Sequence, residues 1–329
     1  MCSRLVYLGS EGRVLTGRSM DWTREIGSNI WTFPRGSERN VEADLPYESW
    51  TAQYGSVVTT AYDICTTDGM NERGLMANLL WLPESEYPNW DGEESALPIS
   101  MWAQYMLDNF ATVAEAVEAA QNDDFVIVTQ RLPDDDRFAA LHLSLSDPTG
   151  DSAIMEFIDG ELVIHHDRDY QVMTNSPTFD KQLALAEYWD EIGGTVMLPG
   201  TNRPADRFVR ARFYTSAIPQ VEDRRAATAS VFSVIRNVSV PYGLSTPDAP
   251  HISSTRWRTV ADHKDRIYYF ESAFTPNVFW VNLDAIDFSS ETSAKTLQLG
   301  PQQSNTFSGE VSDELVASDS FKFLRPHGE

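Results

Sequence analysis

Strand-like and helix-like segments come in separate blocks along this chain, and that order limits its possible folds more than any other feature. Strand-like runs occupy much of 5–81, 125–164 and 266–281, while apolar residues at helical spacing occupy much of 101–120 and 180–238. Sheets of parallel strands are built from strands and helices in strict alternation, which this order does not provide. Grouped strands instead favour antiparallel sheets with helices outside. The sequence therefore predicts an α+β fold.

Turn signals divide the strand blocks into hairpins. Residues 10–12 separate two strand-like runs near the N-terminus, and Asp159-Gly160 separates two more. Asp-Gly between strands is a strong signal for a two-residue hairpin turn. Residues 67–74 are also expected to turn the chain. The first hairpin would bring residues 18–22 back beside the N-terminus.

No internal repeat or low-complexity linker divides the 329 residues, so residues 2–329 are expected to form one domain. Hydrophobic residues make up 42% of the chain, enough for a substantial core. No run approaches the roughly 18 apolar residues of a membrane helix, so no membrane partner is expected. No basic region followed by an apolar run is visible at the start. We expect a cytoplasmic protein if Met1 is the native start, or a periplasmic one whose leader is missing from this sequence.

The formal net charge of −24 excludes some partners. Such a surface repels phosphate backbones, which disfavours nucleic-acid binding. Only four of the basic residues are lysines: Lys181, Lys264, Lys295 and Lys322. An acid-rich, lysine-poor surface stays hydrated in high salt, so a salt-tolerant source is one hypothesis. A genome that favours arginine codons is the alternative.

The chain has two cysteines, Cys2 and Cys65, and no CxxC pair or zinc-like spacing. His165-His166 is the sole histidine cluster, and metal binding there is not expected. Cys65 is interpreted as a buried structural thiol. With Cys2 in a catalytic role no intramolecular disulfide can form, so the core must hold the fold.

Cys2 can become the first residue of the mature chain, because a small second residue lets methionine aminopeptidase remove Met1. The α-amine so exposed has a pKa of about 7.7–8.0, so part of it is neutral and basic near neutral pH. It can accept the thiol proton directly or through one water, which makes one residue both nucleophile and base. Position alone leaves open a functionally idle second residue.

The run Arg18-Ser19-Met20-Asp21-Trp22 strengthens the case for Cys2. It ends the second hairpin strand, which would lie beside the first. An arginine near a thiol lowers the thiol's pKa, and an aspartate can orient the α-amine. The alternative interpretation is a surface Arg–Asp pair, which would contribute little to stability.

Four further segments accompany Cys2 and the run at 18–22. They are GMNERGL at 69–75, TNSPTFD at 174–180, LPG at 198–200 with RFVR at 207–210, and STRW at 254–257. Together these segments resemble the choloylglycine hydrolase family, which comprises bile salt hydrolases and penicillin V acylases. The resemblance spans residues 2 to about 260. Jointly the segments are specific, although any one alone would be weak.

The resemblance implies a role for each matching position. Cys2 is the nucleophile and its α-amine the base, and Arg18 and Asp21 hold and polarise it. The side-chain amide of Asn175 and the backbone N–H of Trp81 form the oxyanion hole. Arg207 matches a second arginine of the family's catalytic site; its alternative is a helix-surface residue paired with Asp206. The resemblance implies no metal and no organic cofactor.

Trp81 is where the chain departs from most of the family. Bile salt hydrolases typically carry Asn there and Gram-positive penicillin V acylases carry Tyr. Trp81, with Trp22, resembles the Gram-negative penicillin V acylase branch. Two indoles suit a flat apolar pocket for a phenoxyacetyl or fatty acyl group, and Met20 joins this substrate-binding set. The alternative is that both tryptophans belong to the core. Trp81 in place of Asn also argues against bile salts.

The resemblance implies a four-layer αββα N-terminal nucleophile (Ntn) hydrolase sandwich, usually assembled as a homotetramer. The substrate is then a small-molecule acyl amide: penicillin V, an N-acyl homoserine lactone or a conjugated bile salt. Two other hypotheses compete with an active hydrolase. One is a lipoprotein anchored through Cys2, which would acylate the proposed base, although no lipobox precedes Cys2. The other is a catalytically silent relative with the same fold.

Overall fold

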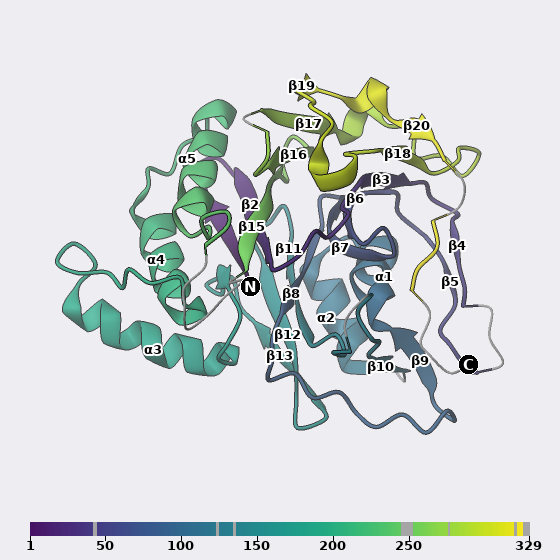
Figure 1. Ribbon diagram of the computed structural model, residues 1–329, viewed down its shortest axis with the longest axis horizontal. Helices are drawn as coiled ribbons and strands as arrows, with labels where there is room; N and C mark the ends of the chain where they lie inside the picture. The colour runs from purple at the N-terminus through teal and green to yellow at the C-terminus, as the bar shows by residue number, and fades with distance from the viewer. Residues whose placement is uncertain are drawn as a thin grey trace.

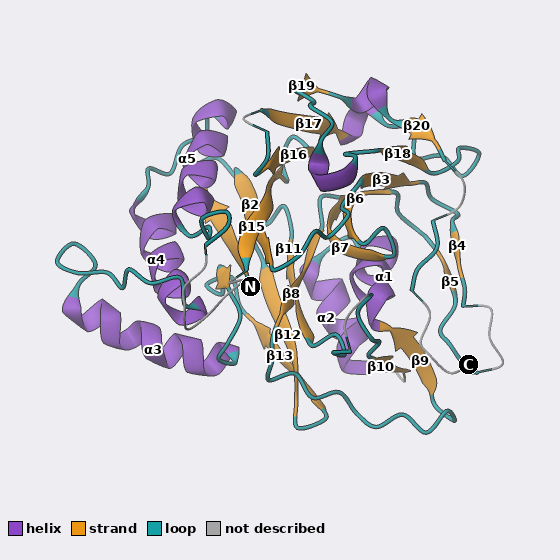
Figure 2. Ribbon diagram, viewed as in Figure 1, coloured by secondary structure: helices purple, strands orange, loops and turns teal. Residues whose placement is uncertain are grey.

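The structure is a computed structural model that describes residues 1–41, 45–122, 125–133, 136–244, 253–275, 277–318 and 321–324. Within these residues, two large sheets stand at the centre of the molecule with helices on either side (Figures 1 and 2). The single domain expected over 2–329 includes residues outside the described ranges, so that expectation stays a prediction.

The first sheet has seven strands in the described residues. Their order is β14 (Val172–Met173), β1 (Cys2–Leu8), β2 (Val14–Trp22), β15 (Ser254–Asp262), β16 (Ile267–Ser272), β17 (Val278–Asn282) and β19 (Gly309–Glu310). All neighbours are antiparallel except β17 and β19. The β1–β2 hairpin predicted from the sequence is therefore confirmed, and it occupies the sheet's interior beside β15.

The second sheet has nine strands in the described part of the chain, all antiparallel. Their order is β13 (Glu161–His166), β12 (Ser152–Ile158), β11 (Leu141–Ser146), β8 (Met76–Trp81), β7 (Cys65–Asn71), β6 (Ser56–Ala61), β3 (Ile30–Phe33), β18 (Lys295–Leu297) and β20 (Val316–Ala317). The turn between β12 and β13 has positive φ at both Asp159 and Gly160, which confirms the predicted hairpin.

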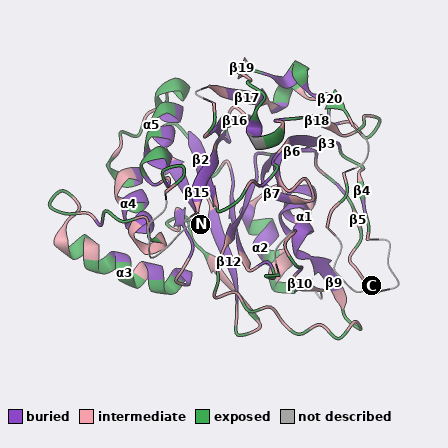
Figure 3. Cartoon of the chain, in the orientation of Figure 1, coloured by how far each residue is buried: buried purple, intermediate pink, exposed green. Residues whose placement is uncertain are grey.

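The helices form the two outer layers. Helices α4 (Pro204–Ala217) and α5 (Arg224–Asn237) pack on β1, β2 and β15, and α3 (Phe179–Ile192) packs on α4. Helices α1 (Trp102–Asn109) and α2 (Val113–Asn122) cover the other sheet at β7, β8 and β12. The result is the predicted four-layer αββα sandwich, whose central strands are almost wholly buried (Figure 3).

Short elements complete the described chain. They are the pairs β9 (Ser95–Pro98) with β10 (Phe125–Val128) and β4 (Glu38–Arg39) with β5 (Trp50–Thr51), and the 3₁₀ turns η1 (Ile99–Met101), η2 (Leu283–Ala285), η3 (Pro301–Gln303) and η4 (Ser312–Glu314).

The predicted turn over 67–74 is shorter than expected. Strand β7 continues to Asn71, so only the residues after it reverse the chain, where Gly74 has a φ of 86°. Two of the polar residues that suggested a turn, Asp68 and Asn71, are buried in the strand and have side-chain hydrogen bonds. Asp68 Oδ2 accepts from Asn78 Nδ2 at 2.6 Å, and Asn71 Nδ2 donates to the Leu107 carbonyl at 2.9 Å. Hydrogen bonding therefore permits a polar stretch to run through the core.

Candidate active site

Cys2 is the first residue of β1 and lies buried between the two sheets, with 2% of its surface exposed. The β1–β2 register pairs Cys2 with Met20 and Arg4 with Arg18. Antiparallel pairing therefore carries the run at 18–22 back beside Cys2, as the sequence suggested. The Cys2 sulfur lies 3.8 Å from the Met20 sulfur.

Arg18 is a buried cation next to the thiol. Its Nη2 lies 3.7 Å from Cys2 Sγ and donates to the Leu79 carbonyl at 3.0 Å. The guanidinium stands 4.5 Å from the ring of Trp257, and its Nη1 is 3.8 Å from Asp68. A positive charge held this close to sulfur in a dry site stabilises a thiolate. This contact excludes the alternative of a surface Arg18–Asp21 pair.

Asp21 offers one free acceptor in the same region. Its Oδ1 accepts from Thr255 at 2.5 Å. Among the described residues its buried Oδ2 makes no hydrogen bond, and it lies 3.6 Å from Arg207 Nη1. A buried carboxylate oxygen without a donor is costly unless a cation stands near it. This oxygen is therefore suited to interact with an amine at the N-terminus.

Met1 is still attached in this structure and occupies part of the site. Its amine donates to the Asp21 carbonyl at 2.7 Å, and the Asp21 N–H donates to the Met1 carbonyl at 2.9 Å. Burial lowers the pKa of the Met1 amine below its ordinary value. The Cys2 nitrogen is an amide here, so it cannot act as a base until Met1 is removed.

Asn175 and Arg207 hold the backbone of Cys2. Asn175 Oδ1 accepts from the Cys2 N–H at 2.6 Å and from Arg207 Nη2 at 2.8 Å. Arg207 Nη1 donates to the Cys2 carbonyl at 2.6 Å. Burial lowers the pKa of Arg207, an effect that the charge of Asp21 opposes. Arg207 is completely buried, so the alternative of a helix-surface residue is wrong.

The backbone of Trp81 lies close to the Asn175 side chain that contacts Cys2. The Leu82 N–H donates to the Ala140 carbonyl at 2.8 Å, away from Cys2. Because successive peptide groups of a strand point to opposite edges, the N–H and C=O of Trp81 point the other way. The Trp81 carbonyl indeed accepts from Asn175 Nδ2 at 2.6 Å. Asn175 therefore connects the backbone of Trp81 with the backbone of Cys2.

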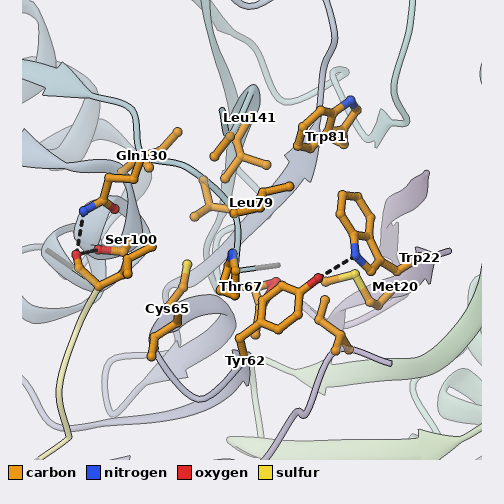
Figure 4. Close-up of a pocket in the computed structure, with 18 of the residues that line it drawn as sticks. Met20, Trp22, Tyr62, Cys65, Thr67, Leu79, Trp81, Ser100, Gln130 and Leu141 are labelled. Carbon is orange, nitrogen blue, oxygen red and sulfur yellow. Dashed lines mark hydrogen bonds between the residues drawn. The ribbon is translucent and has the colours of Figure 1, made fainter. Parts of the chain in front are cut away.

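An apolar pocket opens beside these groups and contains about 690 Å³ of empty space, its mouth included. Trp22 and Trp81 meet in it at 5.4 Å between ring centroids, tilted by 56°. Figure 4 shows Leu79 and Leu141 on the same wall as Trp81, and Cys65 on another part of the lining. The structure thus places both tryptophans in a pocket wall, together with Cys2 and Met20.

Cys65 was expected to be a buried structural thiol, but the residue is only partly buried and lines the same pocket as Cys2. The thiol group itself is shielded from water, which raises its pKa to about 12 and favours the protonated form. The pair at His165-His166 ends strand β13, where His165 lies 3.6 Å from Glu156.

Tyr62 is a pocket residue that the sequence analysis missed. Its hydroxyl accepts from Trp22 Nε1 at 2.8 Å, which fixes the plane of the indole (Figure 4). Tyr62 and Asp63 both have positive φ, at 53° and 55°, in the turn between β6 and β7. Left-handed turns are normally signalled by Gly, Asn or Asp, and this turn contains only Asp63 of these. The local signal for the turn was therefore weak, and it gave no reason to place Tyr62 in a pocket.

The sequence analysis also missed Glu156 and His142, whose hydrogen bonds hold the segment that carries Asn175. Glu156 Oε2 accepts from the Phe179 N–H at 3.0 Å, and its Oε1 lies 2.9 Å from His142 Nδ1. His142 Nε2 meets the Thr174 carbonyl at 3.0 Å. These contacts hold both ends of the segment that carries Asn175. His142 lies in β11 and Glu156 in β12, too far from Asn175 along the chain for sequence spacing to reveal the contact.

Comparison with known proteins gives one consistent result. The family model described as "Linear amide C-N hydrolases, choloylglycine hydrolase family" matches residues 2–296. A penicillin V acylase from Pectobacterium atrosepticum is 52% identical over 344 residues, covering 98% of this chain and 92% of that protein. The structure of penicillin V acylase from Agrobacterium tumefaciens superposes with a TM-score of 0.92 at 60% identity, covering 98% and 99% of the two chains.

More distant relatives carry a different name. A bile salt hydrolase/transferase from Clostridium perfringens is 27% identical, covering 88% of this chain and 93% of that protein.

In the part of the chain that the structure describes, no helix is long and apolar enough to cross a membrane. The same residues contain no group of three His, Cys, Asp or Glu side chains that could hold a metal ion.

Proposed function

This chain belongs to the choloylglycine hydrolase family, and from that membership we propose that it hydrolyses the side-chain amides of penicillin V and of N-acyl homoserine lactones through Cys2. It is a linear amide C–N hydrolase of the Ntn class, similar to penicillin V acylase over 98% of its length. The observation that carries the proposal is the placement of Arg18, Asn175 and the Trp81 backbone around Cys2, beside an apolar pocket.

The first half of the reaction forms an acyl-thioester. Once Met1 is gone, the neutral α-amine of Cys2 takes the thiol proton, and Arg18 stabilises the resulting thiolate. The thiolate attacks the substrate carbonyl, and the carbonyl oxygen becomes negatively charged. Asn175 Nδ2 and the Trp81 N–H donate to that oxygen. The α-ammonium then returns its proton to the leaving nitrogen as the C–N bond breaks.

The second half reverses these roles with water. The amine product leaves, and the α-amine of Cys2 takes a proton from an entering water as the water attacks the thioester. The same two donors stabilise the second oxyanion. When the C–S bond breaks, the sulfur recovers its proton and the carboxylic acid leaves. Asp21 and Arg207 hold the amine and the Cys2 carbonyl throughout, so the nucleophile keeps its position.

The pocket supports aromatic and long apolar acyl groups. Its walls near Cys2 include the apolar side chains of Trp22, Trp81 and Met20, and Arg18 is the cation beside the thiol. A phenoxyacetyl ring or a fatty acyl chain would bury apolar area there. Conjugated bile salts are the alternative that the distant relatives raise. The indole of Trp81 narrows the space that a rigid steroid needs, so we expect bile salts to be the poorest substrates.

Release assays on three substrates test the proposal. Purified protein is incubated with penicillin V, a long-chain acyl homoserine lactone and a glycine-conjugated bile acid. We expect rates in that order or with the first two exchanged, and a dominant bile-acid activity would reject the assignment. Cys2→Ala should abolish turnover, while Cys65→Ala, the matched thiol control, should retain turnover of the same order. Equal activity in wild type and Cys2→Ala would remove Cys2 from the mechanism.

Intact-protein mass spectrometry decides how Cys2 is exposed. Loss of Met1 alone supports an active N-terminal cysteine, whereas a lipid adduct at Cys2 supports the lipoprotein hypothesis. Cell fractionation with the same assay separates a cytoplasmic enzyme from a periplasmic one.

We also propose a homotetramer, as in the family, and light scattering coupled to gel filtration measures the mass. A monomer at working concentration would contradict it.

A further inference from the structure

One residue of the C-terminal tail, defined here as residues 321–324, lines the apolar pocket that also contains Cys2. Leu324 is part of the pocket wall together with Ser100 and Gln130. In Figure 4, Ser100 and Gln130 lie on the opposite side of the pocket from Met20, the register partner of Cys2. The tail therefore stands at the end of the pocket away from the nucleophile.

Three hydrogen bonds hold the backbone of Leu324. Its N–H donates to the Ile64 carbonyl at 2.8 Å. Its carbonyl accepts from Gln130 Nε2 at 2.6 Å and from Ser100 Oγ at 2.8 Å, the contacts drawn as dashed lines in Figure 4. Ser100 and Gln130 are each only 2% exposed. Two buried polar side chains thus satisfy the carbonyl of one tail residue, which fixes that residue in place.

Two aromatic residues anchor the tail just before Leu324. Phe321 packs edge-on against Trp31 of β3, with centroids 5.1 Å apart. Phe323 packs near Phe33 at 6.4 Å and lies 5.5 Å below the guanidinium of Arg39. These contacts attach the tail to the nine-stranded sheet by side chains that do not enter the pocket. The position of Leu324 is therefore set by contacts independent of its own side chain.

We propose that the Leu324 side chain is the end wall of the acyl pocket and determines how long an acyl group the enzyme accepts. This inference rests on the proposed function, because it assumes that the pocket holds the acyl group. The hydrogen bonds to Leu324 use only backbone atoms, so a substitution changes the wall while leaving the tail anchored. A smaller residue at 324 lengthens the pocket, and a larger one shortens it.

The test is a binding profile that needs no turnover. Straight-chain carboxylates from hexanoate to tetradecanoate are the free acyl products, and isothermal titration calorimetry measures their affinity. Each methylene that enters an apolar pocket raises affinity about fourfold, so affinity climbs with length until the chain meets the wall. The chain length at which affinity stops rising is the break in the profile. We expect Leu324→Ala to move this break to chains about two carbons longer, because the substitution removes three carbon atoms from the wall. Leu324→Trp should move it to shorter chains.

Lys322→Ala is the matched control, since Lys322 lies in the same tail and its side chain is exposed. Its profile should coincide with that of wild type. A break at the same chain length in wild type, Leu324→Ala and Leu324→Trp, with thermal unfolding intact, would overturn the proposal. So would a failure of every carboxylate to bind wild type. If wild type does not hydrolyse penicillin V while the two variants still shift the break, the proposed function is rejected and the end wall is retained.

Discussion

At the residue scale, the Tyr62 hydroxyl is the group that orients the Trp22 indole. The hydrogen bond from Trp22 Nε1 measures 2.8 Å, and a left-handed backbone at Tyr62 places the hydroxyl there. We predict that Tyr62→Phe lowers kcat/KM for penicillin V by about three- to tenfold, the range of one net hydrogen bond. Steady-state kinetics measure it. Tyr188→Phe on exposed α3 is the control, and equal losses in both variants would contradict a role for the hydroxyl.

The α-amine of Cys2 should determine how kcat/KM falls at low pH. After Met1 removal this amine lies where the amide now lies, buried beside Asn175. Burial disfavours the charged amine and lowers its pKa, as it does for Met1 here. Since the neutral amine is the base, activity rises with pH through a midpoint below about 7.7–8.0. A kcat/KM profile on penicillin V measures this, and a midpoint above 8 would contradict it.

The residues around Cys2 could be predicted from the sequence, whereas the residues that shape the pocket around them could not. Arg18 and Asp21 lie one hairpin away from Cys2, so a turn signal and strand alternation place them beside it. Asn175 and Arg207 are far along the chain, and only the family resemblance brought them in. The resemblance carried no information on Tyr62 or Leu324, because their contacts are set by tertiary packing. Neither residue type is distinctive at its position.

At the element scale, the segment between β14 and α3 is held by a buried carboxylate. Burial opposes ionisation of Glu156, but hydrogen bonds from His142 and His165 outweigh it and lower its pKa to about 2. The folded pKa lies below the unfolded one. Its stabilisation is therefore complete above about pH 5 and is lost as pH falls toward 2.

Glu156→Gln should therefore destabilise the protein in a pH-dependent way. We predict a loss on the order of 3 kcal/mol at pH 7, which shrinks as pH approaches 3. Turnover should fall as well, because Glu156 braces the segment that carries Asn175. Urea unfolding at both pH values measures the first effect. Glu161→Gln, exposed on neighbouring β13, is the control. A pH-independent difference from wild type would argue for packing instead of charge.

Which elements the sequence revealed follows from how local their signals are. The Asp159-Gly160 hairpin and the helical block over 180–238, which holds most of α3 and all of α4 and α5, were predicted, since a turn dipeptide or helical spacing lies within one short window. Strand β15 was not predicted as a strand, although it is central to its sheet. Its run STRWRTVAD is buried on both faces, so it lacks the alternation of a half-exposed strand. Strands β18 and β20, at one end of the second sheet, are too short to show any period.

At the scale of the whole molecule, charge is the dominant property. The chain has 49 acidic and 25 basic residues, for a net charge of −24. Like charges spread over a folded surface repel one another and destabilise the compact state. Salt screens that repulsion, with a Debye length of about 10 Å at 0.1 M and about 3 Å at 1 M. The sequence hypothesis of salt tolerance thereby becomes a statement about folding stability.

We predict that the free energy of unfolding rises by about 1–2 kcal/mol between 0.05 and 1 M sodium chloride at pH 7, most of it below about 0.3 M. Urea unfolding in a salt series measures this, with residual activity as a second readout. The same series near pH 4.5, the isoelectric point, is the control, because little net charge then remains to be screened. A gain that grows linearly to 1 M at both pH values would indicate general salt exclusion from the surface. No gain at pH 7 would contradict the salt-tolerance hypothesis and favour the alternative that a genome rich in arginine codons explains the few lysines.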